Sequence, residues 1–227
     1  MSILKNIKKI KTFVNPKVKI VAVISNHSIR EINQVLFLDI NNVAQTNVFE
    51  AKKQKSLVKY PASWHMIGAL KKRELKEVVE IFDLIQSVDS FEIANAIDLI
   101  CRAKKKKIAI LIKVNISGQK NISGVRKEHL LALLKKVSTL KNIFVIGLLC
   151  QTPPVVVDFE PYFKDMKNLF NSIKKENLQG LKMKYLSMGA SQNYVSAINN
   201  NSNMILLDKV LFDDKKNSTV NPHENRE

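Results

Sequence analysis

Polar side chains that could bind or transform a small molecule follow an apolar run near the start of the sequence. After KIVAVI come Ser25, Asn26 and His27, which offer a hydroxyl, an amide and an imidazole. In α/β proteins ligands bind beyond the carboxyl ends of parallel strands, where such a segment lies. The sequence identifies no carboxylate partner for His27. It also contains no P-loop, nucleophile elbow or metal-ligand spacing, so we predict no catalytic residue and no metal site.

Two further ionisable residues lie inside apolar runs. Lys113 precedes Asn115 by two residues, so both side chains point to the same face of a strand. A buried lysine has a lowered pKa and can attack an aldehyde, which makes Lys113 a hypothetical imine-forming residue. The alternative is a lysine whose head group reaches water. We predict that His65 is a hydrogen-bonded interior residue rather than a base. The two cysteines, Cys101 and Cys150, are predicted to be reduced thiols outside any disulfide or metal site.

Eight apolar runs would position these residues as strands. They alternate with amphipathic stretches, a pattern that indicates a parallel sheet. Their number and the chain length predict an α/β fold, a (β/α)8 TIM barrel, with an open doubly wound sheet as the alternative. The predicted strands are Val18–Ile24, Phe37–Val43, Trp64–Ile67, Leu84–Ser87, Ile108–Ile116, Phe144–Leu149, Lys184–Leu186 and Met204–Leu207.

Three helices are clearest from the spacing of their apolar residues: Ser90–Ala103, Lys127–Thr139 and Phe159–Lys175. Ser90 and Asp158 are the predicted N-caps of the first and third. Since no Pro/Gly/Ser-rich linker interrupts the pattern, we predict one domain over residues 1–215. Residues 216–227 are predicted to form a disordered polar tail.

In such a barrel, functional residues gather at the carboxyl ends of the strands. The segments that follow the predicted strands therefore form the candidate site. They are Ser25–His27, Ala44–Asn47, Gly68–Leu70, Ser87–Asp89, Asn115–Ser117, Cys150–Thr152, Ser187–Ser191 and Asp208–Lys209.

The charge of the chain is strongly basic, with 37 Lys and Arg residues against 20 Asp and Glu residues and a net charge of +17. These basic residues are spread along the sequence, and the compact run Lys104–Lys107 lies between a predicted helix and a predicted strand. No aromatic residues interleave with a basic motif as in RNA-binding modules. We therefore expect a solvated basic surface rather than a nucleic-acid site. Without a secretory signal or an apolar run of roughly 18 residues, we expect a cytoplasmic monomer with no membrane contact.

Four segments resemble a known family, the pyridoxal phosphate homeostasis proteins, which are single-domain barrels similar to the N-terminal domain of alanine racemase. SWHMIGALKK resembles the family's His-x-Ile-Gly-x-Leu stretch, and IKVNISGQKNISGV is similar to its fifth strand with Asn-Ile-Ser and then Ser-Gly. GLLCQTPP resembles its sixth strand end, and LSMGASQNYVSAI its Ser-Met-Gly-Met-Ser motif. The order and spacing agree from about Val18 to Phe212, which implies the same barrel.

The resemblance also identifies a divergent cofactor site. In the family the first strand ends in Ala-Val-Ser-Lys, and that lysine holds pyridoxal phosphate as a Schiff base. Here AVIS places Ser25 at the lysine position, and serine cannot form an imine. The second strand end, usually Phe-Gly-Glu-Asn-Tyr, reads VAQTN, so Thr46 and Asn47 replace the asparagine and the tyrosine.

The last strand of the family ends in Arg-Ile-Gly-Thr and helps to bind the phosphate. In this chain the corresponding LLDK places Leu206 at the arginine and Asp208 and Lys209 at the Gly-Thr pair. An ionised Asp208 would repel a phosphate. Lys209 either compensates for the lost arginine or pairs with Asp208, and we expect the pair.

The Ser187–Ser191 turn keeps Ser187, Gly189 and Ser191 of the family motif. A small-residue turn that opens a helix offers free N–H groups and the positive end of a helix dipole, which suits an anion. The alternative is that Ser191 only caps the helix that runs toward Ile198.

The resemblance implies a non-catalytic carrier or regulator of pyridoxal phosphate that serves vitamin B6 and amino-acid balance, with covalent binding lost. Its expected ligand is pyridoxal 5′-phosphate or another small phosphate anion. The expected cofactor-binding residues are Ser187, Gly189, Ser191, Ser25, Thr46 and Lys209. One alternative is a racemase-type enzyme, which the missing lysine disfavours. Another is a relic barrel whose basic surface binds a protein or a nucleic acid.

Overall fold

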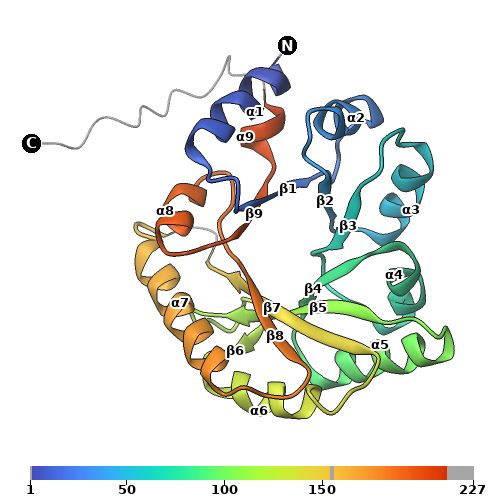
Figure 1. Ribbon diagram of the computed structural model, residues 1–227, viewed down its shortest axis with the longest axis vertical. Helices are drawn as coiled ribbons and strands as arrows, with labels where there is room; N and C mark the ends of the chain where they lie inside the picture. Colours follow the sequence, from blue (N-terminus) through green and yellow to red (C-terminus); the bar gives the residue numbers. More distant parts are fainter. Residues whose placement is uncertain (1, 154–155, 214–227) are drawn as a thin grey trace, which may run out of the picture.

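Eight parallel strands close into a barrel in the computed structural model, which describes residues 2–153 and 156–213 (Figure 1). The strands pair in the order β4–β3–β2–β1–β9–β8–β7–β5, and β4 also pairs with β5. This last pairing closes the sheet, so the predicted TIM barrel is confirmed and the open doubly wound sheet is wrong. The strands are β1 Lys19–Val23, β2 Asn42–Gln45, β3 Ser63–Met66, β4 Leu84–Val88, β5 Ile108–Asn115, β7 Ile143–Gln151, β8 Leu181–Ser187 and β9 Met204–Leu207, with the short β6 Val125–Arg126 beside β5.

Helices surround the barrel on its outside (Figure 1). The three predicted helices correspond to α5, α6 and α7 and differ from them only at their ends. The helices of the described part are α1 Ser2–Phe13, α2 Ile29–Phe37, α3 Val48–Leu57, α4 Leu75–Ile81, α5 Phe91–Ala103, α6 Lys127–Val137, α7 Glu160–Lys175, α8 Tyr194–Asn199 and α9 Lys209–Phe212, with the 3-10 helix η1 Lys72–Glu74.

The two predicted N-caps have different outcomes. Ser90 caps α5, because its side chain accepts the N–H of Ile93 at 3.4 Å. Asp158 is not the N-cap of α7, since that position belongs to Phe159 and the helix begins at Glu160. The Asp158 carboxylate still accepts the N–H of Glu160 at 2.8 Å. The prediction therefore identified the side chain that binds the first turn but placed the helix start one residue early.

One predicted strand, Phe37–Val43, is wrong over most of its length. The helix α2 continues to Phe37, and the chain then turns at Asp39, where φ is +63°, before β2 begins at Asn42. Ser28 and Glu31 form a capping box at the start of α2, which fixes this helix against the competing β-pattern. Of the apolar residues of the run, Phe37 at the helix end is exposed, whereas Ile40 after the turn and Val43 in β2 are buried.

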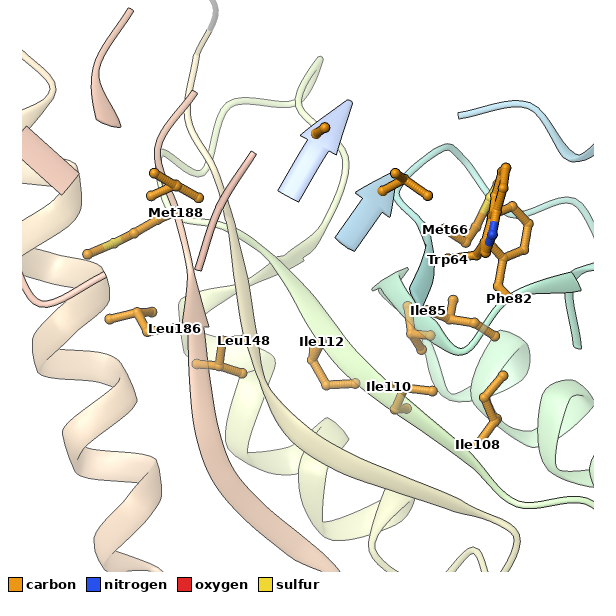
Figure 2. Close-up of a cluster of buried hydrophobic side chains, with 14 of the residues drawn as sticks. Trp64, Met66, Phe82, Ile85, Ile108, Ile110, Ile112, Leu148, Leu186 and Met188 are labelled. Atoms are coloured by element: carbon orange, nitrogen blue, oxygen red, sulfur yellow. The ribbon is translucent and has the colours of Figure 1, made fainter. Parts of the chain in front are cut away.

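The core consists of two apolar layers on opposite sides of the strands. Alternate residues of each strand point into the barrel or toward the helices. On β5, Leu111 packs inside the barrel, whereas Ile108, Ile110 and Ile112 belong to the larger layer under the helices (Figure 2). The alternation places Lys113 on the same face as Leu111, toward the inside of the barrel. A buried polar residue on this face is therefore positioned at the barrel axis.

Before the first strand, α1 packs against the last helix, α9, so the two ends of the described chain lie together (Figure 1). Ile3, Ile7 and Ile10 are buried, and the side-chain amide of Asn6 donates to the Leu211 carbonyl at 3.0 Å. No helix within residues 2–153 and 156–213 is long and apolar enough to cross a membrane. The predicted tail, 216–227, lies outside the described residues.

Candidate functional site

Ser25, which the resemblance places at the position of the family lysine, lies just beyond β1 at the carboxyl end of the barrel. Its hydroxyl donates to the side-chain oxygen of Gln45 at 2.6 Å and lies 3.0 Å from the Thr46 hydroxyl. The same Gln45 oxygen accepts the Thr46 N–H at 2.7 Å, and its amide nitrogen donates to Gln54 at 2.8 Å. Ser25 and Thr46 thus lie together, as the sequence predicted for neighbouring strand ends. Their hydroxyls belong to a hydrogen-bonded network around Gln45.

Next to Thr46, Asn47 is the N-cap of α3. Its side-chain oxygen accepts the N–H groups of Phe49 and Glu50 at 2.9 and 3.1 Å. The residue at the family's tyrosine position therefore starts a helix.

His27 has a carboxylate partner that the sequence analysis missed. Its Nε2 lies 2.8 Å from Asp208 Oδ1, and its ring stacks on Phe212 with centroids 3.7 Å apart. The predicted Asp208–Lys209 pair is wrong, because the ion partner that the structure gives Asp208 is His27. The parallel barrel places the end of β9 beside the end of β1, which brings these residues together across 181 positions of sequence.

The Ser187–Ser191 turn is held by internal hydrogen bonds. Ser187 is fully buried, and its hydroxyl donates to the Gln86 side-chain oxygen at 2.8 Å. The hydroxyl of Ser191 accepts the N–H of Asp208 at 3.0 Å and that of Val210 at 3.3 Å. Ser191 therefore joins the turn to the start of α9. Both hydroxyls already have protein partners at this end of the barrel.

The alternative interpretation of Ser191 as a helix cap is wrong. The helix α8 begins at Tyr194, and its N-cap position belongs to Asn193, whose side chain accepts the N–H of Ala190 at 2.7 Å. Because α8 has only six residues, a helix dipole contributes little to anion binding here. Gly189 has φ +100°, and a Cβ would lie 2.7 Å from that of Ala197, so the turn requires glycine at this position.

A pocket of about 190 Å³ lies beside this turn. Gly189, Leu206 and Leu149 contribute to its wall, so it opens at the ends of β7, β8 and β9. The pocket is smaller than the roughly 300–1,000 Å³ common for drug-sized ligands and suits a compact molecule. Its lining residues are Ile67, Leu149, Cys150, Gln151, Thr152, Phe163, Met188, Gly189, Ala190, Asn193 and Leu206.

Below the pocket, a chain of polar side chains crosses the barrel interior. Gln86 receives the Ser187 hydroxyl and lies 2.9 Å from His65 Nδ1, while His65 Nε2 lies 3.2 Å from the Ser63 hydroxyl. These distances confirm that His65 is a hydrogen-bonded interior residue. Burial, with a smaller contribution from Lys19, lowers the pKa of His65 to about 4. The imidazole is therefore neutral near pH 7.

Lys113 points into the same end of the barrel and is 9% exposed. Its Nζ donates to the Ser123 hydroxyl at 2.7 Å, so the head group binds the β5–β6 loop rather than extending into bulk water. Burial lowers the pKa of Lys113, and Asp89 partly opposes this shift. Conversely, burial raises the pKa of Asp89, while Lys113 lowers it.

The loop after β5 is shaped by Asn115. Its side-chain nitrogen donates to the carbonyls of Gln119 and Ile122 at 2.8 Å each, and its oxygen accepts the Gly118 N–H at 2.9 Å. Gly124 packs closely against β5, and a Cβ at this position would lie 2.6 Å from the backbone nitrogen of Asn115. The Asn-Ile-Ser and Ser-Gly pattern in this segment thus fixes the loop that carries Ser123.

Cys101 and Cys150 are both free thiols, as predicted. Burial raises the pKa of Cys150 to about 12 and that of Cys101 to about 11. Neither thiol is activated as a nucleophile. Within the part of the chain that the structure describes, no group of three His, Cys, Asp or Glu residues is arranged to hold a metal ion.

The basic run Lys104–Lys107 lies between α5 and β5, as predicted. The ammonium group of Lys104 pairs with Glu80, and that of Lys106 donates to the Val79 carbonyl. Half of the run therefore binds α4.

Sequence comparison places the chain among characterised relatives. The model of the alanine racemase N-terminal domain matches residues 1–206. A pyridoxal phosphate homeostasis protein from Synechocystis is 32% identical over 204 residues, which cover 88% of this chain and 93% of the relative. Another from Aquifex aeolicus is 31% identical over 170 residues, with 73% of this chain and 72% of the relative covered.

Solved structures share the same barrel. PipY from Synechococcus elongatus, determined without pyridoxal phosphate, superposes with a TM-score of 0.88 at 23% identity and covers 93% of this chain and 100% of PipY. PipY with pyridoxal phosphate bound gives a TM-score of 0.86 at 22% identity with the same coverage. Alanine racemase from Clostridium difficile gives 0.77 at 15% identity, covering 95% of this chain and 56% of the racemase. At these identities the structural likeness establishes the fold.

Proposed function

Because the chain belongs to the family of the pyridoxal phosphate homeostasis proteins and carries the alanine racemase N-terminal domain, we propose that it binds pyridoxal phosphate as a non-catalytic carrier. In this role it holds the cofactor reversibly and contributes to vitamin B6 balance. The binding does not use the Schiff base at the end of the first strand, because Ser25 has no amine.

The observation that carries the proposal is the pocket beside the Gly189 turn. Leu149 and Leu206 supply apolar walls for an aromatic ring, and Gln151 and Asn193 supply polar groups to the lining. The pocket lies where the family motif Ser-Met-Gly is retained, which is the site that the resemblance assigns to the phosphate. Lys209, exposed at the first position of α9, supplies a positive charge near this end of the barrel. When bound, the cofactor contributes an aldehyde and a phosphate.

The same geometry disfavours racemase chemistry at Ser25. Its hydroxyl is held by Gln45 at 2.6 Å, and the chemistry of racemisation requires an imine that a hydroxyl cannot form. The neighbouring His27 is engaged by Asp208. We therefore propose that the protein is not an enzyme. We also propose that it acts as a monomer in the cytoplasm.

Equilibrium dialysis of the purified protein against pyridoxal phosphate tests the proposal. We expect saturable binding that inorganic phosphate displaces, because the phosphate group anchors the ligand. Binding that is absent, or that excess phosphate leaves unchanged, would contradict the proposal.

A matched pair of variants sharpens this test. Leu206→Arg introduces a charged donor at the position that the resemblance gives to the family arginine, and Leu206→Gln introduces a shorter, uncharged polar side chain. A hydrogen bond to a charged group is worth about 1.5–3 kcal/mol, or roughly ten- to a hundredfold in affinity. We expect this gain for the arginine variant alone. Equal affinities of the two variants would place the phosphate elsewhere.

A further inference from the structure

Lys113 lies beside the pocket that the proposed function assigns to pyridoxal phosphate. On the neighbouring strand its register partner is Leu149, and Leu149 lines the pocket. Both residues face the barrel interior, so Lys113 lies one strand away from a lining residue of the pocket without lining the pocket itself. Its head group donates a hydrogen bond to the Ser123 hydroxyl of the β5–β6 loop.

The surroundings of Lys113 suit an amine that reacts as a nucleophile. It is 9% exposed, and its hydrogen-bond partner is a neutral hydroxyl, Ser123, at 2.7 Å. No carboxylate of the described residues forms an ion pair with it, and Asp89, just after the end of β4, is the charged group that acts on it. Burial lowers the pKa of Lys113, which raises the fraction of neutral amine near pH 7. A neutral amine beside a ligand pocket can attack an aldehyde.

The loop that holds the head group is itself well fixed. Asn115 binds the carbonyls of Gln119 and Ile122, and this keeps Ser123 above the end of β5. The Lys113–Ser123 hydrogen bond, at 2.7 Å, is a single contact to a neutral hydroxyl. It can be exchanged for a covalent bond when a ligand enters.

We propose that Lys113 is a second, non-homologous anchor for aldehyde ligands and forms a reversible imine with pyridoxal phosphate held in the pocket. The neutral amine of Lys113 attacks the aldehyde carbon, and one N–H proton passes to the carbonyl oxygen. The resulting carbinolamine then loses its hydroxyl group with the second N–H proton as water, which leaves a C=N bond. Overall one aldehyde and one primary amine give one imine and one water, with no oxidant or reductant.

Reductive trapping tests the proposal, which rests on the proposed function. The full chain is incubated with pyridoxal phosphate, treated with borohydride, digested and mapped by mass spectrometry. We expect the reduced pyridoxyl group on the peptide that contains Lys113, at a yield clearly above that of the exposed Lys135, because a lysine beside the ligand pocket meets the bound aldehyde and a surface lysine does not. No adduct, or adducts spread equally over surface lysines, would overturn the proposal.

Three variants separate chemistry from folding. Lys113→Met is expected to abolish the adduct and the imine absorption band, whereas Lys135→Met changes a lysine on the outer helix α6 and leaves both unchanged. Ser123→Ala frees the head group and is expected to raise the trapping rate, which a purely structural lysine would not show. A trapping rate unaffected by Ser123→Ala, in a variant that folds, would contradict the proposed movement.

The result also separates this proposal from the proposed function. Dialysis of the same samples measures total binding. Phosphate-sensitive binding without a Lys113 adduct overturns the second anchor and retains the carrier function. An adduct on Lys113 that excess phosphate leaves unchanged supports a reactive lysine and contradicts the phosphate site.

Discussion

Acid should destabilise the protein through one buried imidazole, that of His65. The ring lies between Gln86 and Ser63 inside the barrel and is 3% exposed. Burial keeps its pKa in the folded protein at about 4, against 6.5 for an ordinary histidine. Below pH 6.5 the unfolded chain binds a proton at this residue, whereas the folded protein does so only near pH 4. The free energy of unfolding therefore falls as the pH falls through this window.

The gap between these pKa values sets the magnitude of the effect. A pKa unit corresponds to about 1.4 kcal/mol, so the full loss at low pH is about 3 kcal/mol, of which about 2 kcal/mol has developed by pH 5. This is a large fraction of the 5–15 kcal/mol that is typical of native proteins. Urea unfolding at pH 7.5, 6 and 5, followed by circular dichroism, measures it.

The variant His65→Gln provides the control. Its amide offers one acceptor and one donor group to the neighbours of His65 and does not titrate. We expect the variant to lose about 2 kcal/mol less than the wild type between pH 7.5 and pH 5. Parallel losses in the two proteins would refute the assignment of a buried neutral imidazole at this position.

Three substitutions test other parts of the structure. Ser25→Lys places an amine where the resemblance puts the family lysine. We expect this variant to show an imine absorption band with pyridoxal phosphate and a borohydride-trapped peptide at residue 25. A variant that binds the ligand without the band would contradict the alignment of this strand end. Gln86→Leu leaves the fully buried Ser187 hydroxyl without its acceptor. We expect the free energy of unfolding, measured in urea, to fall by about 1–3 kcal/mol. An unchanged urea midpoint would count against this contact. Gly147→Ala would place a Cβ 1.8 Å from the Tyr185 carbonyl oxygen. The resulting strand separation should lower the thermal midpoint by several degrees for a loss of about 1–3 kcal/mol, and a midpoint equal to that of the wild type would show that the strands can move apart freely.

Most of the barrel could be predicted because its strands are buried on both faces and read as continuous apolar runs. Ile108–Asn115 is an example, since burial on both sides of β5 leaves little ambiguity. The failure at Phe37–Val43 has a local cause. The run contains too few residues to separate a helix end from a strand start by periodicity, and the Ser28 capping box that decides the matter lies nine residues before Phe37.

The grouping of the strand-end segments was predictable, but the contacts between their side chains were not. Parallel strands bring their carboxyl ends to one side, so the segments around Ser25 and Ser187 could be grouped from order alone. The partners of His27 and Ser187 could not be found in this way, because Asp208 and Gln86 lie 181 and 101 positions away along the chain. Which side chain meets which across a barrel depends on strand register, and register is not visible in a single sequence.

The internal contacts at the carboxyl end explain how the chain tolerates its departures from the family pattern. A buried polar group without a partner costs about 1–3 kcal/mol, so a lost ligand contact would destabilise the fold if nothing replaced it. The Ser25 hydroxyl is satisfied by Gln45. The Asp208 carboxylate is 44% exposed, so it carries only part of this cost, and it pairs with His27. The amide of Asp208 is bound by the Ser191 hydroxyl at 3.0 Å. These groups therefore satisfy one another without a contact to a ligand. The ligand that we propose for the pocket and for Lys113 is therefore not needed to satisfy these groups, which agrees with the reversible binding of the proposed carrier.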